Sequence, residues 1–329
     1  MKSLVMGAAA ALIATAAAAA DFKPAVIFDM GGKFDKSFNE GVWNGVERFT
    51  EETGIDVMEF EVTNEAQREQ AMRRMVSRGA TIVLGVGFAQ ADAIDAVAKD
   101  NPDVQFSIID VSWLDRPNLR QYSFKEHEGS YLVGVAAAKA SKSGKVGFVG
   151  GMDIPLIRKF ACGYVQGAKA AGASDVFEAM TGVEPKAWND PGKGAEIAQA
   201  QMDRGADVIY HAAGGTGLGV IRAAADAGKL AIGVDSNQNA IAPGSVLTSM
   251  LKRVDVAAYE TFKDAQDGNF SAGVKILGIA EGGVDWAVDE NNEPLLTDEI
   301  KSAVEVAKAG ILSGDIKVYN YEDASNCPA

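Results

Sequence analysis

The chain has 329 residues, of which 47% are hydrophobic, and it carries a formal net charge of −14 at pH 7. Its length is sufficient for two hydrophobic cores. Nucleic acids and anionic lipids are bound through basic patches, so the acidic balance argues against both as partners.

The first twenty residues have the pattern of a secretory signal peptide. Lys2 gives a positively charged start, residues 4–20 are apolar and rich in alanine, and small residues precede a cleavage site between Ala20 and Asp21. We therefore predict a signal peptide over residues 1–20 and a mature protein in the periplasm. No cysteine lies near the predicted cleavage site, so we expect no lipid anchor.

Residues 21–124 alternate short apolar runs with longer amphipathic stretches. The apolar runs are nearly continuous, as in strands that are buried on both faces of a parallel sheet. Such alternation with short connections predicts right-handed βαβ units in a doubly wound α/β sheet. The predicted strands cover residues 25–29, 57–62, 81–87, 105–110 and 120–124, and the predicted helices cover residues 38–53, 65–78 and 89–100.

The same pattern starts again after residue 124. Ile108-Ile109-Asp110 resembles Gly233-Val234-Asp235, 125 residues later, and two further segments recur at nearly the same offset. Repetition of this kind indicates two similar α/β lobes. The predicted strands cover residues 145–150, 176–183, 207–212 and 230–234, and the predicted helices cover residues 127–141, 156–171, 192–204 and 217–227.

The last part of the chain contains elements that we expect to cross between the lobes. They are strands over residues 245–250 and 274–280 and helices over residues 254–266 and 297–313. We predict three hinge strands, an N-terminal lobe of residues 21–124 plus 251–274, and a C-terminal lobe of residues 125–250 plus 275–329. Ligands of open α/β sheets bind outside the carboxyl ends of the strands, so we expect the ligand between the lobes.

The segment between the first strand and the first helix holds the densest group of candidate binding residues. Asp29 ends the strand, Gly31 and Gly32 let the backbone turn close to a ligand, and Phe38 and Asn39 begin the helix. An aromatic face beside a carboxylate and an amide suits a planar heterocycle with a polar edge. The alternative interpretation is a loop with a serine or asparagine helix cap and one core phenylalanine.

This segment resembles the signature of the basic membrane protein family, also called the purine nucleoside receptor family. Members of that family are substrate-binding proteins of ABC importers and have the type I periplasmic-binding fold. The similarity extends over almost the whole mature chain. It includes residues 127–134 (HEGSYLVG), 144–151 (GKVGFVGG), 188–191 (WNDP), 213–219 (AGGTGLG), 233–235 (GVD) and 247–252 (LTSMLK).

The resemblance implies a nucleoside site in the cleft. Asp29 and Asn39 would hydrogen-bond the edge of the base, and Phe38 would stack on one of its faces. Trp188, which directly follows a strand of the second lobe, is the candidate for the other stacking face.

The resemblance also implies that Asp235 and Lys252 hold the ribose hydroxyls. A carboxylate can accept two vicinal hydroxyl hydrogens, and an ammonium group can donate to a ring or hydroxyl oxygen while it balances the charge of the acid. Other strand ends and one helix start supply further candidates for the cavity wall, namely Gly87, Phe88, Asp110 and Gly215.

The residues do not support an enzyme. Residues 214–219 follow a strand and open a helix, but their glycine spacing differs from the dinucleotide-binding fingerprint. His127 and His211 have neither a nucleophile nor a metal-ligand spacing, so we expect no catalytic residue, cofactor or metal. Cys162 and Cys327 permit a disulfide bond in an oxidising compartment, but the sequence does not fix their separation.

Three ligand classes fit these residues in a definite order. Aromatic candidates favour a flat ligand, and the Asp235 and Lys252 side chains favour hydroxyl groups. We rank a purine nucleoside first, a free nucleobase or another planar heterocycle second, and a sugar third. The predicted protein is a monomer whose lobes close on the ligand before it docks on an ABC permease with its ATPase subunits.

Overall fold

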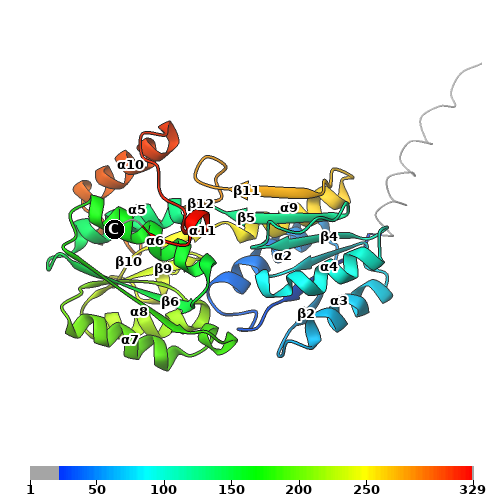
Figure 1. Ribbon diagram of the computed structural model, residues 1–329, viewed down its shortest axis with the longest axis horizontal. Coiled ribbons are helices and arrows are strands. Elements are labelled where there is room, and N and C mark those ends of the chain that lie inside the picture. Colours follow the sequence, from blue (N-terminus) through cyan, green and yellow to red (C-terminus); the bar gives the residue numbers. More distant parts are fainter. Residues whose placement is uncertain (1–21, 328–329) are drawn as a thin grey trace, which may run out of the picture.

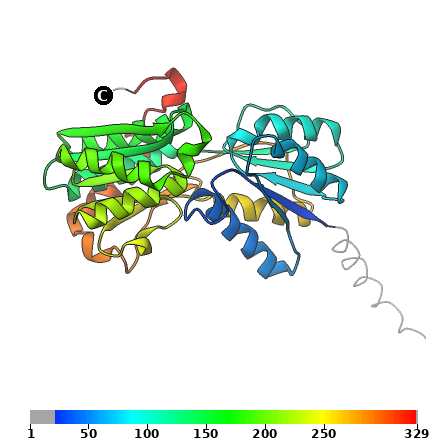
Figure 2. The ribbon, with the colours of Figure 1, turned by 90° about the horizontal axis from the view of Figure 1, so that it is seen from below.

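Two α/β lobes of similar architecture make up residues 22–327, the part of the chain that the computed structural model describes (Figure 1). Each lobe contains one six-stranded sheet, which confirms the predicted pair of doubly wound lobes. Seen from below, the two bodies lie side by side with a narrow connection between them (Figure 2). The predicted signal peptide over residues 1–20 lies outside the described residues.

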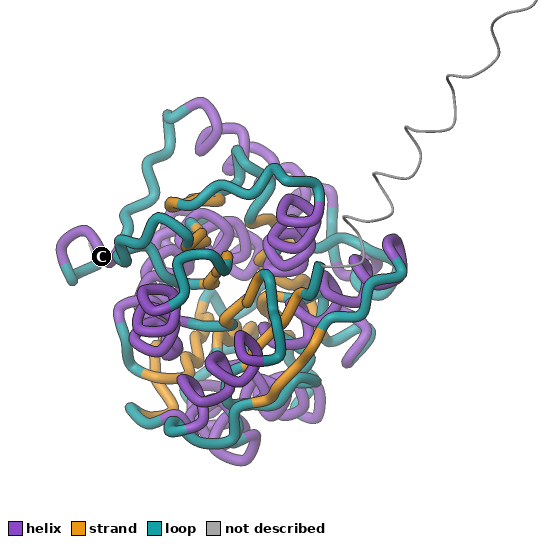
Figure 3. Tube along the Cα trace, turned by 90° about the vertical axis from the view of Figure 1, so that its right-hand side faces the viewer, coloured by secondary structure: helices purple, strands orange, loops and turns teal. Residues whose placement is uncertain are grey.

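The N-terminal lobe has a fully parallel sheet in the spatial order β11-β5-β4-β3-β1-β2. Its strands are β1 (Pro24–Phe28), β2 (Met58–Glu61), β3 (Ile82–Gly85), β4 (Gln105–Ile109), β5 (Leu119–Phe124) and β11 (Gly273–Leu277). Its helices are α2 (Phe38–Thr53), α3 (Gln67–Ser77), α4 (Ala91–Asp100) and α9 (Val254–Gln266). The view onto this lobe shows the strands enclosed by helices (Figure 3), as the apolar β1 and β3 require.

The C-terminal lobe has the strand order β12-β10-β9-β8-β6-β7, in which only β12 is antiparallel to its neighbour. Its strands are β6 (Lys145–Met152), β7 (Asp175–Gly182), β8 (Val208–Ala212), β9 (Leu230–Asp235), β10 (Val246–Lys252) and β12 (Val284–Trp286). Its helices are α5 (Glu126–Ala140), α6 (Pro155–Ala170), α7 (Pro191–Asp203), α8 (Gly217–Asp226), α10 (Asp298–Ser313) and α11 (Tyr321–Ala324).

The predicted elements agree with the observed ones to within three residues at each end. β12 and α11 were not predicted, because three strand residues or one helical turn are too short to show a hydrophobic period. No helix within residues 22–327 is both long and apolar enough to span a bilayer.

The chain crosses between the lobes three times. It passes from β5 into α5, from β10 into α9, and from β11 into β12. The last two crossings come later than the expected boundaries after residues 250 and 274. The reason is that β10 and β11 stay paired within their sheets up to Lys252 and Leu277.

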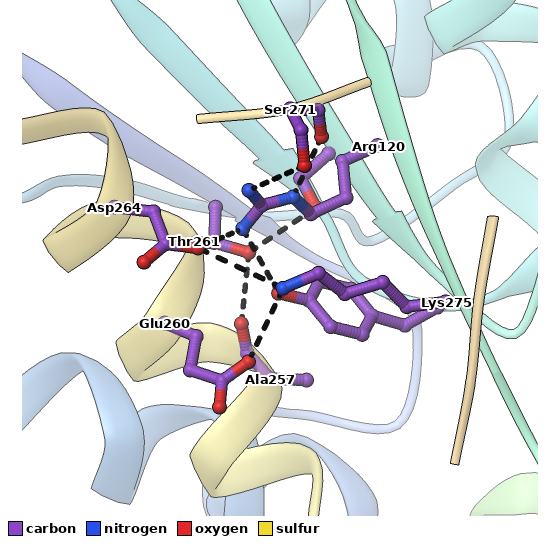
Figure 4. A network of polar contacts seen from close by, with 9 residues as sticks. Arg120, Ala257, Glu260, Thr261, Asp264, Ser271 and Lys275 are labelled. Carbon is purple, nitrogen blue, oxygen red and sulfur yellow. Dashed lines mark hydrogen bonds and ion pairs between the residues drawn. The ribbon is translucent and has the colours of Figure 1, made fainter. Parts of the chain in front are cut away.

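A buried arginine joins the three elements of the N-terminal lobe that adjoin the crossings, namely β5, α9 and β11 (Figure 4). Arg120 on β5 donates to Asp264 Oδ2 on α9 at 2.7 Å and to the Ser271 carbonyl oxygen at 2.9 Å. Lys275 on β11 lies 3.7 Å from the same Asp264 carboxylate. Since β5, α9 and β11 each adjoin a crossing, the network fixes these segments relative to one another.

The C-terminal segment is anchored on α6 by a disulfide bond between Cys162 and Cys327, whose Cα atoms are 5.5 Å apart. Gln166 Nε2 donates to the Tyr319 carbonyl oxygen at 3.0 Å, and Tyr319 N donates back to Gln166 Oε1 at 2.8 Å. The bond that the sequence only permitted is therefore formed, because α6 and the C-terminal segment pack side by side.

Candidate functional site

A cavity lies between the lobes at the carboxyl ends of the strands. It encloses about 660 Å³ of space, including its open mouth, and both lobes line it. The structure brings nine of the ten predicted site residues to this cavity: Asp29, Phe38, Asn39, Gly87, Phe88, Asp110, Trp188, Asp235 and Lys252. Residues outside the predicted set also line it, among them Asp35, Ile157 and Phe160.

Gly215 is the predicted site residue that does not line the cavity. Gly214 turns the chain with a φ of 54° and faces the cavity in its place. A side chain at Gly215 would lie 3.4 Å from Asn189 Oδ1 and from the Trp188 carbonyl oxygen, so this glycine packs behind the wall. The backbone turn decides which of the two neighbouring glycines faces the cavity, and here it is Gly214.

Hydrogen-bond acceptors gather at one end of the cavity, around Asp29 and Asn39. Asp29 Oδ1 accepts from the Met30 N–H at 2.8 Å and forms a 3.3 Å ion pair with Arg68. Burial raises the pKa of Asp29, and the Met30 N–H and Arg68 oppose that shift. Asn39 Nδ2 donates to the Gly32 carbonyl oxygen at 3.2 Å, whereas its Oδ1 is buried and has no hydrogen-bond partner within residues 22–327. This end therefore suits a ligand edge that carries N–H groups.

Aromatic side chains from both lobes form the walls of the cavity. Phe38 begins α2 in the N-terminal lobe, and Trp188 follows β7 in the C-terminal lobe. Two glycines make room for these walls. A Cβ at Gly151 would come within 2.2 Å of the Trp188 ring, and Gly87, with a φ of 94°, lies against Phe38 and Asp29. The rings therefore lie where a flat ligand could contact them.

Two aspartates at equivalent strand ends have left-handed backbone conformations. Asp110 follows β4 with a φ of 67°, and Asp235 ends β9 with a φ of 63°. This region is unfavourable for residues with a Cβ, by about 1–2 kcal/mol, although aspartate adopts it more readily than most. The repeated Ile-Ile-Asp and Gly-Val-Asp segments thus place one carboxylate from each lobe at the cavity in the same conformation.

Lys252 ion-pairs with Asp110 and Glu126 instead of making a direct pair with Asp235. Its Nζ lies 2.6 Å from Asp110 Oδ1 and 3.0 Å from Glu126 Oε1. Burial would lower the pKa of Lys252, but Asp110, Glu126 and Asp235 together raise it. Three aromatic rings also surround the ammonium group, with centroids within 5.1–5.5 Å, namely Phe38, Phe124 and Phe160.

Glu126 joins the cavity to a second buried cation, Lys159 on α6. Lys159 Nζ lies 2.8 Å from Glu126 Oε2 and 2.8 Å from Glu322 Oε2 on α11. Burial would raise the pKa of Glu126, but Lys159 and Lys252 outweigh it and lower the pKa to about 2. In contrast, burial raises the pKa of Asp110 to about 6 despite Lys252. Glu126 could not be predicted as a site residue, because nothing in its local sequence pattern distinguishes it from any other residue at the start of a helix.

Asp235 connects the two lobes across the cavity. Its Oδ2 accepts a hydrogen bond from Ser37 Oγ at 2.6 Å. Ser236 Oγ donates to the Ser37 carbonyl oxygen at 2.8 Å, and Gln238 Nε2 donates to the Lys36 carbonyl oxygen at 2.8 Å. The loop before α2 and the segment after β9 therefore contact each other, and Asp235 belongs to both the cavity wall and the contact between lobes.

Asp35 caps α2, a role that one interpretation of the sequence gave to a serine or asparagine. Its carboxylate accepts hydrogen bonds from the backbone N–H groups of Ser37, Asn39 and Glu40 at 2.8–3.1 Å. Burial raises the pKa of Asp35 to about 7, although these three N–H groups favour the charged form. Ser37 does not cap the helix, because its hydroxyl donates to Asp235.

The buried histidines take no part in a metal site. Within residues 22–327, no three His, Cys, Asp or Glu side chains are grouped so that they could hold a metal ion. His211 Nε2 lies 3.0 Å from Gln238 Oε1, and burial lowers the pKa of His127 and of His211 to about 4. Both rings are therefore neutral at neutral pH.

Comparison with known proteins places the chain in a family. The family model described as "ABC transporter substrate-binding protein PnrA-like" matches residues 22–322. The chain is 33% identical to the "ABC transporter nucleoside-binding protein BmpA" of Lactococcus lactis subsp. cremoris, over 91% of this chain and 89% of that protein. It is 34% identical to the "CD4+ T-cell-stimulating antigen" of Listeria monocytogenes, over 91% of this chain and 88% of that protein.

The same relationship is seen in three dimensions. A crystal structure of an ABC transporter solute-binding protein from Aeropyrum pernix superimposes with a TM-score of 0.84 at 28% identity, covering 92% of this chain and 95% of that one. The fold is the type I periplasmic-binding fold that the sequence predicted. The chain is a member of the PnrA-like family of ABC transporter substrate-binding proteins.

Proposed function

We propose that this protein is the periplasmic receptor of a nucleoside importer and that it binds a purine nucleoside between its lobes. The observation that carries the proposal is the polarity of the cavity. One end combines aromatic walls with the Asp29 carboxylate and with Asn39 Oδ1, which has no hydrogen-bond partner among the described residues, and the other end combines carboxylates with a buried ammonium group. A nucleoside has the matching two ends, a flat base with N–H groups and a hydroxylated sugar.

The base would lie between the rings of Phe38 and Trp188, with its amino edge toward Asp29 and Asn39. Each aromatic contact of this kind is worth about 1–3 kcal/mol. A hydrogen bond to a charged group adds about 1.5–3 kcal/mol. After the costs of ordering the ligand and the lobes, a few such interactions are sufficient for submicromolar affinity.

The ribose would lie against Asp235 and near Lys252. Asp235 has one oxygen engaged by Ser37, and its carboxylate lines the cavity, so it can accept hydroxyl hydrogens. The acid-rich setting argues against phosphorylated ligands. Three buried carboxylates, those of Asp110, Glu126 and Asp235, accompany the two ammonium groups of Lys159 and Lys252, so a nucleotide would bring further negative charge into an already acidic site.

Release and delivery would depend on lobe movement and not on chemistry, and we assign no catalytic residue. The contacts from Ser37 to Asp235 and Ser236 join the lobes at the cavity, so a ligand that lies against Asp235 stabilises the arrangement in which they form. An ABC permease with its ATPase would then receive the ligand from the closed monomer. The nucleoside-binding name of the Lactococcus relative supports the ligand class.

Isothermal titration calorimetry with the mature protein tests the proposal. Adenosine and guanosine should bind with submicromolar affinity, while adenine, ribose and the corresponding monophosphates should bind at least about tenfold more weakly. Mass spectrometry of molecules released by denaturing the protein from its native host should identify a nucleoside. Tight binding of a free base or a sugar, with no binding of either nucleoside, would refute the proposal.

A further inference from the structure

A second cavity, the outer cavity, adjoins the ligand cavity and opens to solvent between the lobes. It encloses about 630 Å³, including its open mouth. Four residues line both cavities, namely Asp29, Met30, Phe88 and Trp188. The two spaces therefore share a boundary made by these four residues, and the N-terminal and C-terminal lobes both contribute to it.

The outer cavity adjoins the aromatic end of the ligand cavity and not its acidic end. Asp110, Asp235 and Lys252 line the ligand cavity alone, whereas Asp29 and Trp188 line both. In the proposed orientation the amino edge of the base faces Asp29. That edge therefore points toward the outer cavity, and the ribose points away from it.

Apolar side chains form much of the outer cavity. Ala89, Met152, Val183 and Pro185 line it in addition to the shared Met30, Phe88 and Trp188, and the charged residues Glu65, Arg68 and Glu184 complete its wall. Val183 is 68% exposed and lines this cavity. A hydrophobic surface that is open to solvent next to a ligand cavity can bury an apolar group of the ligand.

Arg68 supplies a polar group at the boundary between the two cavities. Its guanidinium forms the 3.3 Å ion pair with Asp29, and its buried Nε has no hydrogen-bond partner among the described residues. The pair fixes the Asp29 carboxylate at the boundary. A secondary amine on the base can therefore donate its remaining N–H to an acceptor at this boundary while its substituent extends outward.

We propose that the outer cavity is a subsite for an apolar substituent on the exocyclic amino group of a purine nucleoside. The receptor would thus accept N-alkylated and N-arylalkylated purine nucleosides as well as the parent compounds. This inference rests on the proposed function. It adds a second compartment to the binding site, one that takes an apolar substituent of the ligand.

Calorimetry with two isomeric ligands tests the subsite. N6-benzyladenosine carries a benzyl group at the amino edge, and 5′-O-benzyladenosine carries the same group at the ribose end. The first should bind within about tenfold of adenosine or more tightly, because its ring is buried against apolar side chains. The second should lose at least about 100-fold in affinity, because Asp110, Asp235 and Lys252 at the acidic end do not line the outer cavity and an apolar ring there would desolvate their charges.

A matched pair of variants locates the subsite. Val183→Asp places a charge in the wall of the outer cavity, and Val306→Asp places one on α10 at a valine of nearly equal exposure, 67%. Val183→Asp should weaken the binding of N6-benzyladenosine at least about fivefold and change the affinity for adenosine less than about twofold. Val306→Asp should leave the affinity for both ligands unchanged.

The outcomes separate this inference from the proposed function. If adenosine binds but N6-benzyladenosine does not, or if Val183→Asp leaves N6-benzyladenosine unaffected, the subsite is refuted and the nucleoside receptor stands. Preferential tolerance of 5′-O-benzyladenosine would reverse the orientation and likewise overturn the subsite alone. If no purine nucleoside binds, the proposed function fails, and the subsite fails with it.

Discussion

Replacement of Lys252 by methionine should destabilise the protein strongly at neutral pH. Lys252 Nζ lies 2.6 Å from Asp110 and 3.0 Å from Glu126, and all three side chains are buried. Methionine has a similar length but no charge. The substitution therefore leaves two buried carboxylates, with Lys159 as the remaining ammonium group in contact with Glu126.

The size of the expected loss of stability follows from the burial of the ion pairs that Lys252 makes. Removing one partner of a buried ion pair costs about 3–5 kcal/mol, because the remaining charge is left without compensation. Each kcal/mol lowers the melting temperature by roughly 2–4 °C in chains of 150–250 residues. We therefore expect the melting temperature of Lys252→Met at pH 7 to fall by roughly 6–20 °C.

The loss of stability caused by Lys252→Met should become smaller at acidic pH. In the native protein Lys159 and Lys252 lower the pKa of Glu126 to about 2, from an ordinary value of 4.5. A lowered carboxyl pKa stabilises the fold above pH 4.5, and this contribution disappears as the pH falls from 4.5 to 2. In the variant, burial without Lys252 raises the pKa values of Glu126 and Asp110. Protonation then removes their charge, so wild type and variant should converge as the pH falls from 7 to 4.

Urea denaturation followed by tryptophan fluorescence at pH 7 and pH 4 measures this effect. Lys193→Met is the matched control, because Lys193 forms an exposed pair with Glu196 at 3.0 Å. That control should lose less than about 1 kcal/mol at either pH. A loss below about 1 kcal/mol for Lys252→Met at pH 7, or an equal loss at pH 4, would refute the view that Lys252 compensates two buried carboxylates.

Three further substitutions test the site, the hinge and the C-terminal anchor. Asp235→Ala should weaken nucleoside binding at least about tenfold in calorimetry while the circular dichroism spectrum stays native, and unchanged binding would remove Asp235 from the site. Arg120→Met removes the 2.7 Å ion pair with Asp264 and should lower the free energy of unfolding, measured in urea, by about 2–4 kcal/mol. A loss within experimental error would mean that the network does not hold β5, α9 and β11 together. The Cys162→Ser, Cys327→Ser double variant should lose about 2–4 kcal/mol of stability yet bind nucleoside normally, and a stability equal to that of wild type would show that the bond does not constrain the chain.

The two lobes could be predicted because the sequence patterns that indicate their strands involve only neighbouring residues. Strands buried on both faces of a parallel sheet must be continuously apolar, and β1 and β3 show this within a few residues. The same rule located Asp29, Asp110 and Asp235, since the residue at the end of a buried parallel strand lies at the ligand edge of the sheet. The short β12 and α11 carry too few residues for such a signal.

The sequence by itself determined the two-lobed fold and most of the cavity wall, because periodicity and strand ends are properties of neighbouring residues. Only the tertiary structure decided the electrostatics of the site. Glu126 and Lys159 lie in segments whose local pattern is ordinary, and they acquire their roles from charges that the fold brings within about 3 Å. The Coulomb energy of a buried charge depends on distance and dielectric environment, and neither quantity exists until the chain is folded.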